Sequence, residues 1–200
     1  MKEKEYSDVS EMKQIITNLK KAGVSGEELA DVFEAYHFMK DAHEGQFRKY
    51  SDVPYRVHPV SVALIVSKQH NLTRAKVVAA LLHDTIEDTE VTFGMISSLF
   101  GSEVARLVLE LTKISLPSNG NRAFRRMLDR RYLARVSLDA KGIKLADVTN
   151  NTSNIVQQDP KFAKQYLKES LLLIPLIQEG NYKLHALLDV HIRKSLEELA

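Results

Sequence analysis

The sequence contains no cysteine, which excludes a disulfide scaffold, a thiolate zinc site and a cysteine nucleophile. Glycine and proline are scarce, with 8 and 5 residues, so signals that break helices are few and long helices are expected. No apolar run is long enough to cross a bilayer, and the N-terminal residues are too polar for a signal peptide. We therefore expect a cytoplasmic protein that does not interact with a membrane.

Neither sign of charge dominates, because 28 lysines and arginines face 26 acidic residues for a formal charge of +2. That balance gives no reason to expect a nucleic-acid partner. One segment is nevertheless basic, and we favour a solvated helix face over a nucleic-acid surface for it. A third interpretation is that one or two of its arginines contact a polyphosphate. The segment contains Arg122, Arg125, Arg126, Arg130, Arg131 and Arg135.

Apolar residues recur at spacings of three and four through most of the 200 residues, a pattern that predicts helices rather than strands. Ser25 followed by Glu28 three residues later predicts a capping box at a helix start. Asp159 before Pro160 predicts another helix start, and Pro175 is expected to kink or end that helix. We therefore predict an all-α protein, a single domain over residues 1–200 built as a bundle of about eight to ten helices.

The stretch AALLHDTIEDT places four ionisable residues directly after an apolar run: His83, Asp84, Glu87 and Asp88. Buried charges of this kind are costly unless something pairs with them. The stretch is therefore either the solvated end of a helix or part of a metal site. Glu87 lies four residues after His83, and Asp88 lies four after Asp84, so each pair can share a helical face.

Two further residues extend this set: His58 at a predicted loop-to-helix junction and Asp147 in KLADVTNN. With His83 and Asp84 they form a nitrogen and oxygen ligand set that suits manganese, iron, cobalt, zinc or magnesium. Each residue alone has an ordinary structural explanation, but their joint occurrence favours a metal site. Two more carboxylates beside the metal would lie where a water is oriented or deprotonated.

The segments HEGQFRKYSDVPYRVHP, AALLHDTIEDT and IKLADVTNN resemble the HD-domain phosphohydrolases, and within them the hydrolase domain of the SpoT/RelA-type alarmone enzymes. The resemblance covers about residues 36–154, with C-terminal helices over 159–200, and implies one HD domain. It implies manganese-dependent hydrolysis of the 3′-pyrophosphate of guanosine 3′,5′-bis(diphosphate), (p)ppGpp, to GDP or GTP and pyrophosphate. No synthetase region follows, so the chain is similar to the small stand-alone hydrolases, which include the metazoan SpoT homologue.

The resemblance also implies roles for individual residues. Glu87 and Asp88 correspond to the acidic pair that positions the attacking water. Arg48 corresponds to a residue that packs on the purine, Lys49 to one near substrate phosphate, and Asn151 to one that hydrogen-bonds the nucleoside. The implied metal ligands are His58, His83, Asp84 and Asp147.

Several alternatives remain open at this point. The segment after Asp147 departs from the family pattern around the nucleoside, which puts guanine specificity in doubt, so an NADPH 2′-phosphatase or another nucleotidase is one rival function. A degenerate nucleotide-binding module and a nucleic-acid binder are the other two. The expected partner is a small nucleotide, divalent metals other than manganese are admitted, and a homo-oligomer is not excluded. His43 is the expected neighbour of the metal ligands among the other histidines. Tyr50, Tyr55 and Tyr132 are candidates for the pocket, although core or rim positions are favoured.

Overall fold

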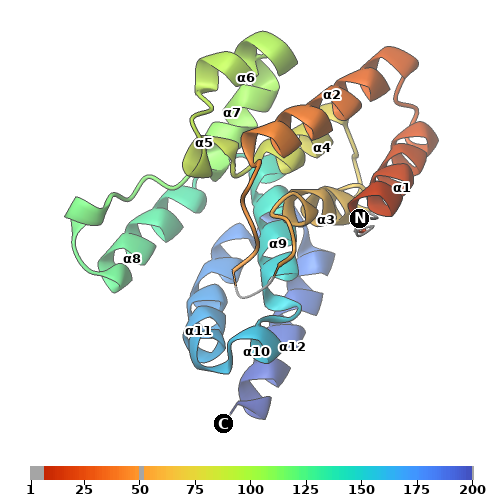
Figure 1. Ribbon diagram of the computed structural model, residues 1–200. Coiled ribbons are helices and arrows are strands. Elements are labelled where there is room, and N and C mark those ends of the chain that lie inside the picture. The colour runs from red at the N-terminus through yellow and green to blue at the C-terminus, as the bar shows by residue number, and fades with distance from the viewer. Residues whose placement is uncertain (1–6, 50–51, 200) are drawn as a thin grey trace. The chain divides into compact units, whose positions relative to one another are not determined.

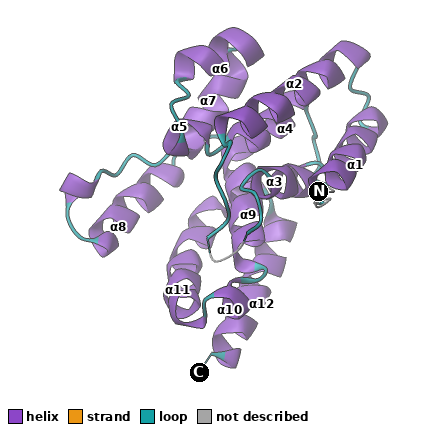
Figure 2. Cartoon of the chain, in the orientation of Figure 1, coloured by secondary structure: helices purple, strands orange, loops and turns teal. Residues whose placement is uncertain are grey.

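The computed structural model describes residues 7–49 and 52–199, and the chain divides into two compact units between Leu109 and Glu110. Within the described residues there are ten α-helices of eight residues or more, two four-residue α-helices and two 3-10 helices (Figure 1). The described part holds no strand, only one isolated bridge between Phe47 and Pro54 (Figure 2). The all-α prediction is therefore confirmed.

The first unit is organised around α4, which packs against α2 and α3, while α1 packs against α3. Ala75 and all of residues 77–82 in α4 are buried, so this short helix is apolar on every side from Val77 onwards. A helix of that kind belongs in the middle of a core. The helices of this unit are α1 (Asp8–Lys21), α2 (Gly26–Ala42), α3 (Val57–Val66), α4 (Arg74–Leu82), α5 (Thr85–Asp88), α6 (Phe93–Phe100) and α7 (Ser102–Leu111), which runs across the boundary.

The capping box predicted at the start of α2 is present. The Glu28 backbone N–H donates to the Ser25 hydroxyl at 3.4 Å, and the Ser25 backbone N–H donates to the Glu28 carboxylate at 3.0 Å. These two bonds satisfy backbone donors that a helix start leaves exposed. They fix where α2 begins, and α2 leads directly into the loop that precedes α3.

The loop between α2 and α3 folds back on itself. The Arg48 backbone N–H donates to the Val53 carbonyl at 2.8 Å, and the Tyr55 N–H donates to the Gln46 carbonyl at 2.9 Å. These bonds hold Tyr55 beside the residues that directly follow α2. Tyr50, a candidate pocket residue, lies outside the described residues.

A buried ion pair ties α1 to the start of α3. The Asp8 carboxylate is 2% exposed and accepts from the Arg56 Nε at 2.9 Å and from the Tyr36 hydroxyl at 3.0 Å. Burial first, and then the hydrogen bond to Asp8, raise the pKa of Tyr36 to about 12. Arg56 lies two residues before His58, so this contact stabilises the first turn of α3, which contains His58.

In the second unit α9 is the central helix, and it packs against α11, α12 and η2. Gly180 in η2 lies so close to α9 that an added Cβ would overlap the backbone of Lys141 and Gly142. Only glycine allows this approach, and the Lys141 ammonium pairs with Glu179 at 2.7 Å beside it. The elements are η1 (Pro117–Asn119), α8 (Arg122–Leu133), α9 (Leu138–Thr152), α10 (Ile155–Gln158), α11 (Pro160–Ile177), η2 (Gln178–Gly180) and α12 (Tyr182–Glu198).

Helix α11 begins as predicted, because the Asp159 carboxylate accepts from the Phe162 backbone N–H at 3.0 Å and Pro160 occupies the first helical position. Pro175 lies inside the helix, which continues to Ile177 before η2 begins. A proline lacks the N–H that the helix needs at that position. The helix nevertheless continues for two residues after the proline.

Candidate metal centre

Three of the four predicted ligands come together in the first unit. One ligand atom each from His58, His83 and Asp84 lies within 4.8 Å of the other two. The Asp84 Oδ2 lies 3.0 Å from the His83 Nε2 and 3.6 Å from the His58 Nε2. Both histidines are 3% exposed, whereas the Asp84 side chain is 19% exposed. The cluster is therefore reached from solvent on the Asp84 side.

The local structure explains why these side chains converge. His58 lies in the first turn of α3. His83 is the residue that follows α4, and Asp84 is the residue that precedes α5. His83 and Asp84 lie between these two helices, and these adjacent residues place an imidazole and a carboxylate 3.0 Å apart. The His58 and His83 rings lie 5.2 Å apart at an interplanar angle of 67°.

The protonation of His83 suits a metal ligand. Its Nδ1 lies 2.8 Å from the Ala80 carbonyl oxygen. A carbonyl oxygen can only accept, so Nδ1 carries the proton and donates it. In the neutral ring the lone pair is then on Nε2, the atom that faces Asp84 and His58. Histidines that bind metals are commonly oriented in this way, so the residues present fit a divalent metal.

The predicted acidic pair lies on α5, the single turn that starts after Asp84. The Asp88 backbone N–H donates to the Asp84 carbonyl at 2.9 Å, which closes this turn. Glu87 is half-buried and Asp88 is exposed. Both carboxylates therefore belong to the same short segment as two of the clustered ligands, and this segment reaches solvent.

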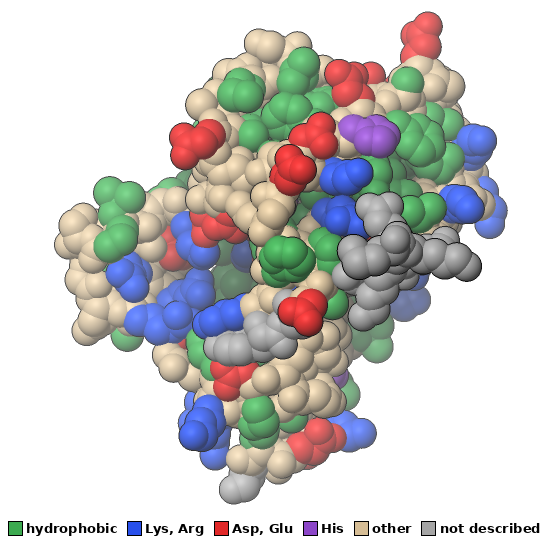
Figure 3. Space-filling view, viewed as in Figure 1, with side chains coloured by type: hydrophobic (Ala, Val, Ile, Leu, Met, Phe, Trp, Pro, Cys, Tyr) green, Lys and Arg blue, Asp and Glu red, His purple; other side chains and the backbone are tan. Residues whose placement is uncertain are grey.

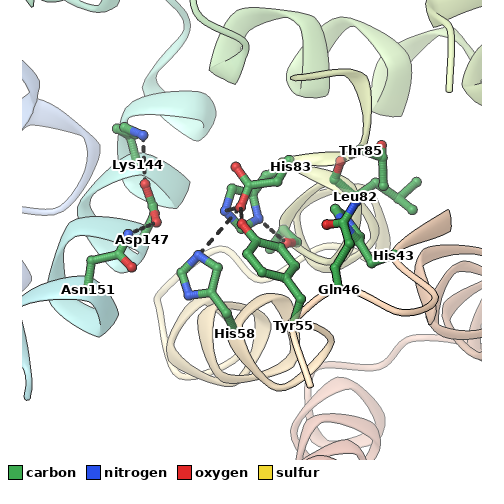
Figure 4. Close-up of polar contacts among 12 residues, drawn as sticks. His43, Gln46, Tyr55, His58, Leu82, His83, Thr85, Lys144, Asp147 and Asn151 are labelled. Atoms are coloured by element: carbon green, nitrogen blue, oxygen red, sulfur yellow. Dashed lines mark hydrogen bonds and ion pairs between the residues drawn. The ribbon is translucent and has the colours of Figure 1, made fainter. Parts of the chain in front are cut away.

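Tyr55 makes a contact that sequence analysis missed. Its hydroxyl donates to the Asp84 Oδ2 at 2.5 Å, and its ring lies 5.8 Å from the His58 ring (Figure 4). The Arg48 guanidinium lies 6.0 Å from the centre of the Tyr55 ring. Arg48 is half-buried, and its neighbour Lys49 is exposed. The available signal was the position of Tyr55 three residues before His58, in the turn that leads into α3, where the His58 backbone N–H donates to the Tyr55 carbonyl at 2.9 Å.

Asp147 and Asn151 belong to the second unit, on α9. Asp147 is 5% exposed, and its carboxylate accepts from the Asn151 amide and from the Lys144 ammonium, each at 2.6 Å. Asn151 therefore shares a helical face with Asp147, as the spacing of four predicts. The role of Asp147 as the fourth ligand stays a prediction, as do the roles of the other site residues.

The basic segment of the second unit lines a cavity of about 260 Å³ between α8 and residues 113–117. Lysine and arginine side chains gather over α8 on the face shown in Figure 3. Glu169 on α11 accepts two hydrogen bonds from Arg122, at 2.7 and 2.8 Å, and pairs with Arg126 at 3.4 Å. The lining residues are Lys113, Ser115, Pro117, Arg122, Arg125, Arg126 and Asp129.

Two tyrosines of this unit keep their protons at neutral pH. Burial first, and then the nearby Asp147 carboxylate, raise the pKa of Tyr166 to about 12. Burial, followed by the charge of Glu110, raises the pKa of Tyr132. Both line a small cavity with Lys144 and Arg126, where their hydroxyls are hydrogen-bond donors. Tyr132 thus lies at a cavity, which its sequence context left undecided.

Residues 35–174 match a model of the HD domain. The chain belongs to the HD-domain family. This match begins in the first unit and ends in the second, and the single domain over residues 1–200 stays a prediction. The curated relatives include proteins named for an activity on guanosine 3′,5′-bis(diphosphate), and the similarity extends over most of the present chain.

A Haemophilus influenzae protein named guanosine-3′,5′-bis(diphosphate) 3′-pyrophosphohydrolase is 36% identical over 165 residues, which are 80% of this chain but only 23% of that protein. A Danio rerio protein of the same name, MESH1, is 37% identical over 135 residues, 66% of this chain and 73% of its own length. The chain thus matches about a quarter of the longer relatives and most of the shorter one.

A solved structure, described as a metazoan ortholog of SpoT that hydrolyzes ppGpp, is similar with a TM-score of 0.74 and 30% sequence identity. The similarity covers 82% of this chain and 95% of the solved one. Fold and sequence therefore agree on the family. Among the described residues, no helix combines the length and the apolar character that crossing a membrane requires.

Proposed function

We propose that this HD domain hydrolyses the 3′-pyrophosphate of guanosine 3′,5′-bis(diphosphate), ppGpp or pppGpp, to GDP or GTP and pyrophosphate. The observation that carries the proposal is the cluster of the buried His58 and His83 with the partly exposed Asp84, in which Ala80 sets the tautomer of His83. The names of the relatives at 36% and 37% identity support the choice of substrate. A nucleotide of this kind fits a cytoplasmic location.

The proposed metal is Mn²⁺, held by His58, His83, Asp84 and Asp147. A mixed imidazole and carboxylate set suits this ion, although it also suits other divalent metals. When bound, such an ion would lower the pKa of a coordinated water towards neutrality. The three clustered side chains already lie close together, so little rearrangement is needed within the first unit to bind an ion.

The acidic turn α5 supplies the proposed general base. Glu87 or Asp88 accepts the proton of the attacking water or holds that water in line with the scissile bond. The water oxygen bonds to the phosphorus attached to the ribose 3′ oxygen, and the bond from that phosphorus to the 3′ oxygen breaks. The 3′ oxygen takes up a proton, and pyrophosphate leaves.

The remaining residues bind the nucleotide. A planar guanidinium stacks well on a base, so we propose that Arg48 packs on the purine. The exposed Lys49 ammonium is proposed to contact phosphate, and the Asn151 side chain the nucleoside. The cavity beside α8 favours Arg122, Arg125 and Arg126, among the six arginines of the basic segment, as the proposed contacts to a second phosphate group.

Product analysis tests the proposal. Manganese-loaded protein is incubated with ppGpp, and GDP and pyrophosphate are separated by anion-exchange chromatography, with Asp84→Ala as the control. We expect release by the wild type alone. If wild-type protein that binds manganese in a titration released no pyrophosphate from ppGpp, the proposed substrate would be wrong. A parallel panel with NADPH and nucleoside monophosphates would then identify the rival hydrolase.

A further inference from the structure

Three residues without a role in the proposed chemistry surround the metal cluster in the first unit. His43 is the residue that follows α2, and Gln46 and Tyr55 lie in the loop before α3. Figure 4 shows His43 and Gln46 beside Tyr55, on the side away from His58. His43 is 3% exposed, so its ring is part of the interior rather than of a solvated loop.

Tyr55 acts on a proposed metal ligand. Its hydroxyl donates to the Oδ2 of Asp84, and this oxygen is also the one that faces the Nε2 atoms of both histidines. A donor on a carboxylate oxygen fixes the rotation of the carboxylate and stabilises its charged form. The Tyr55 hydroxyl therefore sets which oxygen of Asp84 lies in the cluster.

Gln46 acts on the acidic turn. Its Nε2 donates to the Asp88 carbonyl oxygen at 3.1 Å, so its Oε1 faces the Nδ1 of His43 at 2.9 Å. An amide oxygen can only accept, so the His43 Nδ1 carries the proton. His43 thus donates to Gln46, and Gln46 donates to Asp88, the last residue of α5.

His43 contacts both Tyr55 and Gln46. Its ring lies 4.7 Å from the Tyr55 ring at an interplanar angle of 34°, while its Nδ1 holds Gln46. A backbone hydrogen bond also joins Tyr55 to Gln46, because the Tyr55 N–H donates to the Gln46 carbonyl at 2.9 Å. A rigid ring at the end of α2 therefore supports both the tyrosine on Asp84 and the glutamine on α5.

We infer that Tyr55 and Gln46, both supported by His43, are positioning residues that hold the Asp84 carboxylate and the α5 turn in one arrangement. Tyr55 orients a metal ligand, and Gln46 orients the turn that carries Glu87 and Asp88. The inference rests on the proposed function for its effect on turnover. Its effect on metal binding depends only on the cluster of His58, His83 and Asp84.

The first test compares two matched tyrosines. Tyr55→Phe removes the hydroxyl that donates to Asp84, and Tyr36→Phe removes a hydroxyl that donates to Asp8 in the same unit. Isothermal titration with Mn²⁺ should show affinity about 10- to 100-fold weaker for Tyr55→Phe, the loss typical of a group that orients a metal ligand. Tyr36→Phe should bind Mn²⁺ like the wild type, although its unfolding temperature should fall because Asp8 loses a hydrogen bond.

The second test separates binding from turnover. Gln46→Leu removes the donor to Asp88 and leaves the three clustered ligands and Tyr55 in place. We expect its Mn²⁺ affinity and KM to match the wild type while kcat falls about 10- to 100-fold. Gln69→Leu is the control, because it removes a different glutamine in the same unit. Thermal unfolding of each variant shows that it is folded.

The outcomes distinguish this inference from the proposed function. Wild-type protein that binds neither Mn²⁺ nor any other divalent metal would overturn the metal site itself and both proposals with it. If wild type and Tyr55→Phe bind Mn²⁺ equally well, the role of Tyr55 is wrong while the proposed function stands. If Tyr55→Phe loses its fold, the kcat of Gln46→Leu decides, and an unchanged kcat overturns the inference.

Discussion

The Nδ1 of His83 lies 2.8 Å from the carbonyl oxygen of Ala80, one turn earlier in the chain. This single contact leaves the Nε2 lone pair of His83 directed at the Asp84 carboxylate, 3.0 Å away. The end of α4 therefore supplies both the ligand and the group that orients it. No residue distant in sequence is needed to fix this tautomer.

Manganese should stabilise the fold through this cluster. An ion that binds only the folded state, present at about 100 times its Kd, raises the free energy of unfolding by about 2.7 kcal/mol. We expect the unfolding temperature to rise on adding MnCl₂ and to fall again on adding EDTA. His83→Ala should abolish the shift, whereas His70→Ala, at an exposed position of the same unit, should retain it. A full shift in His83→Ala would remove this residue from the site.

Glu87→Gln should reduce turnover and leave metal binding intact. A positioned general base contributes about 100- to 10,000-fold to the rate, so kcat should fall by that order while KM changes little. Steady-state release of pyrophosphate measures both constants. The exposed Glu90, three residues on, provides the control, and Glu90→Gln should be fully active. Full activity of Glu87→Gln instead would assign the proton transfer to another group.

Arg48→Ala should mainly raise KM. A guanidinium over a ring contributes about 0.5–2 kcal/mol, which corresponds to a KM roughly 2- to 30-fold higher. Because the base does not change during the reaction, this contact is equal in the ground and transition states, and kcat should be retained. Arg106→Ala, at an exposed position of α7, should leave both constants unchanged. A fall in kcat with constant KM would contradict the assigned role.

The Glu169 carboxyl should make the stability of the chain depend on acid pH. Burial raises its pKa, but the hydrogen bonds from Arg122 and Gln165 and the charges of Arg122 and Arg126 outweigh burial and lower it overall. A carboxyl with a lowered pKa stabilises the folded state above its unfolded pKa of about 4.3, and the stabilisation is lost as pH falls through the folded value. At neutral pH it contributes about 1 kcal/mol, because the group is partly exposed.

Urea unfolding of the wild type and Glu169→Gln measures this contribution. The difference in free energy of unfolding should be largest at neutral pH and should shrink once pH falls below about 4.3. Glu197→Gln, at an exposed position of α12, should show no such difference. A gap between wild type and Glu169→Gln that stays constant down to about pH 2 would show that the carboxylate charge is not the cause.

Most of the secondary structure could be predicted because its signals are local. The capping box at Ser25 and Glu28, and Asp159 before Pro160, depend on residues within one helical turn. The end of α11 was harder to predict, because a proline inside a helix can kink it or end it, and here the helix continues to Ile177. Long apolar periodicity was sufficient to predict an all-α protein.

The sequence by itself determined the side-chain types of the candidate ligands, the adjacency of His83 and Asp84, and the acidic pair four residues later. Only the tertiary structure brought His58 to them, since α3 and α4 are separate helices that must first pack. It also decided the contact of Tyr55, whose hydroxyl donates to Asp84 from 29 positions earlier in the chain. The physical reason is that helical spacing fixes neighbours within a helix, whereas neighbours on different helices depend on how the side chains of the core pack together.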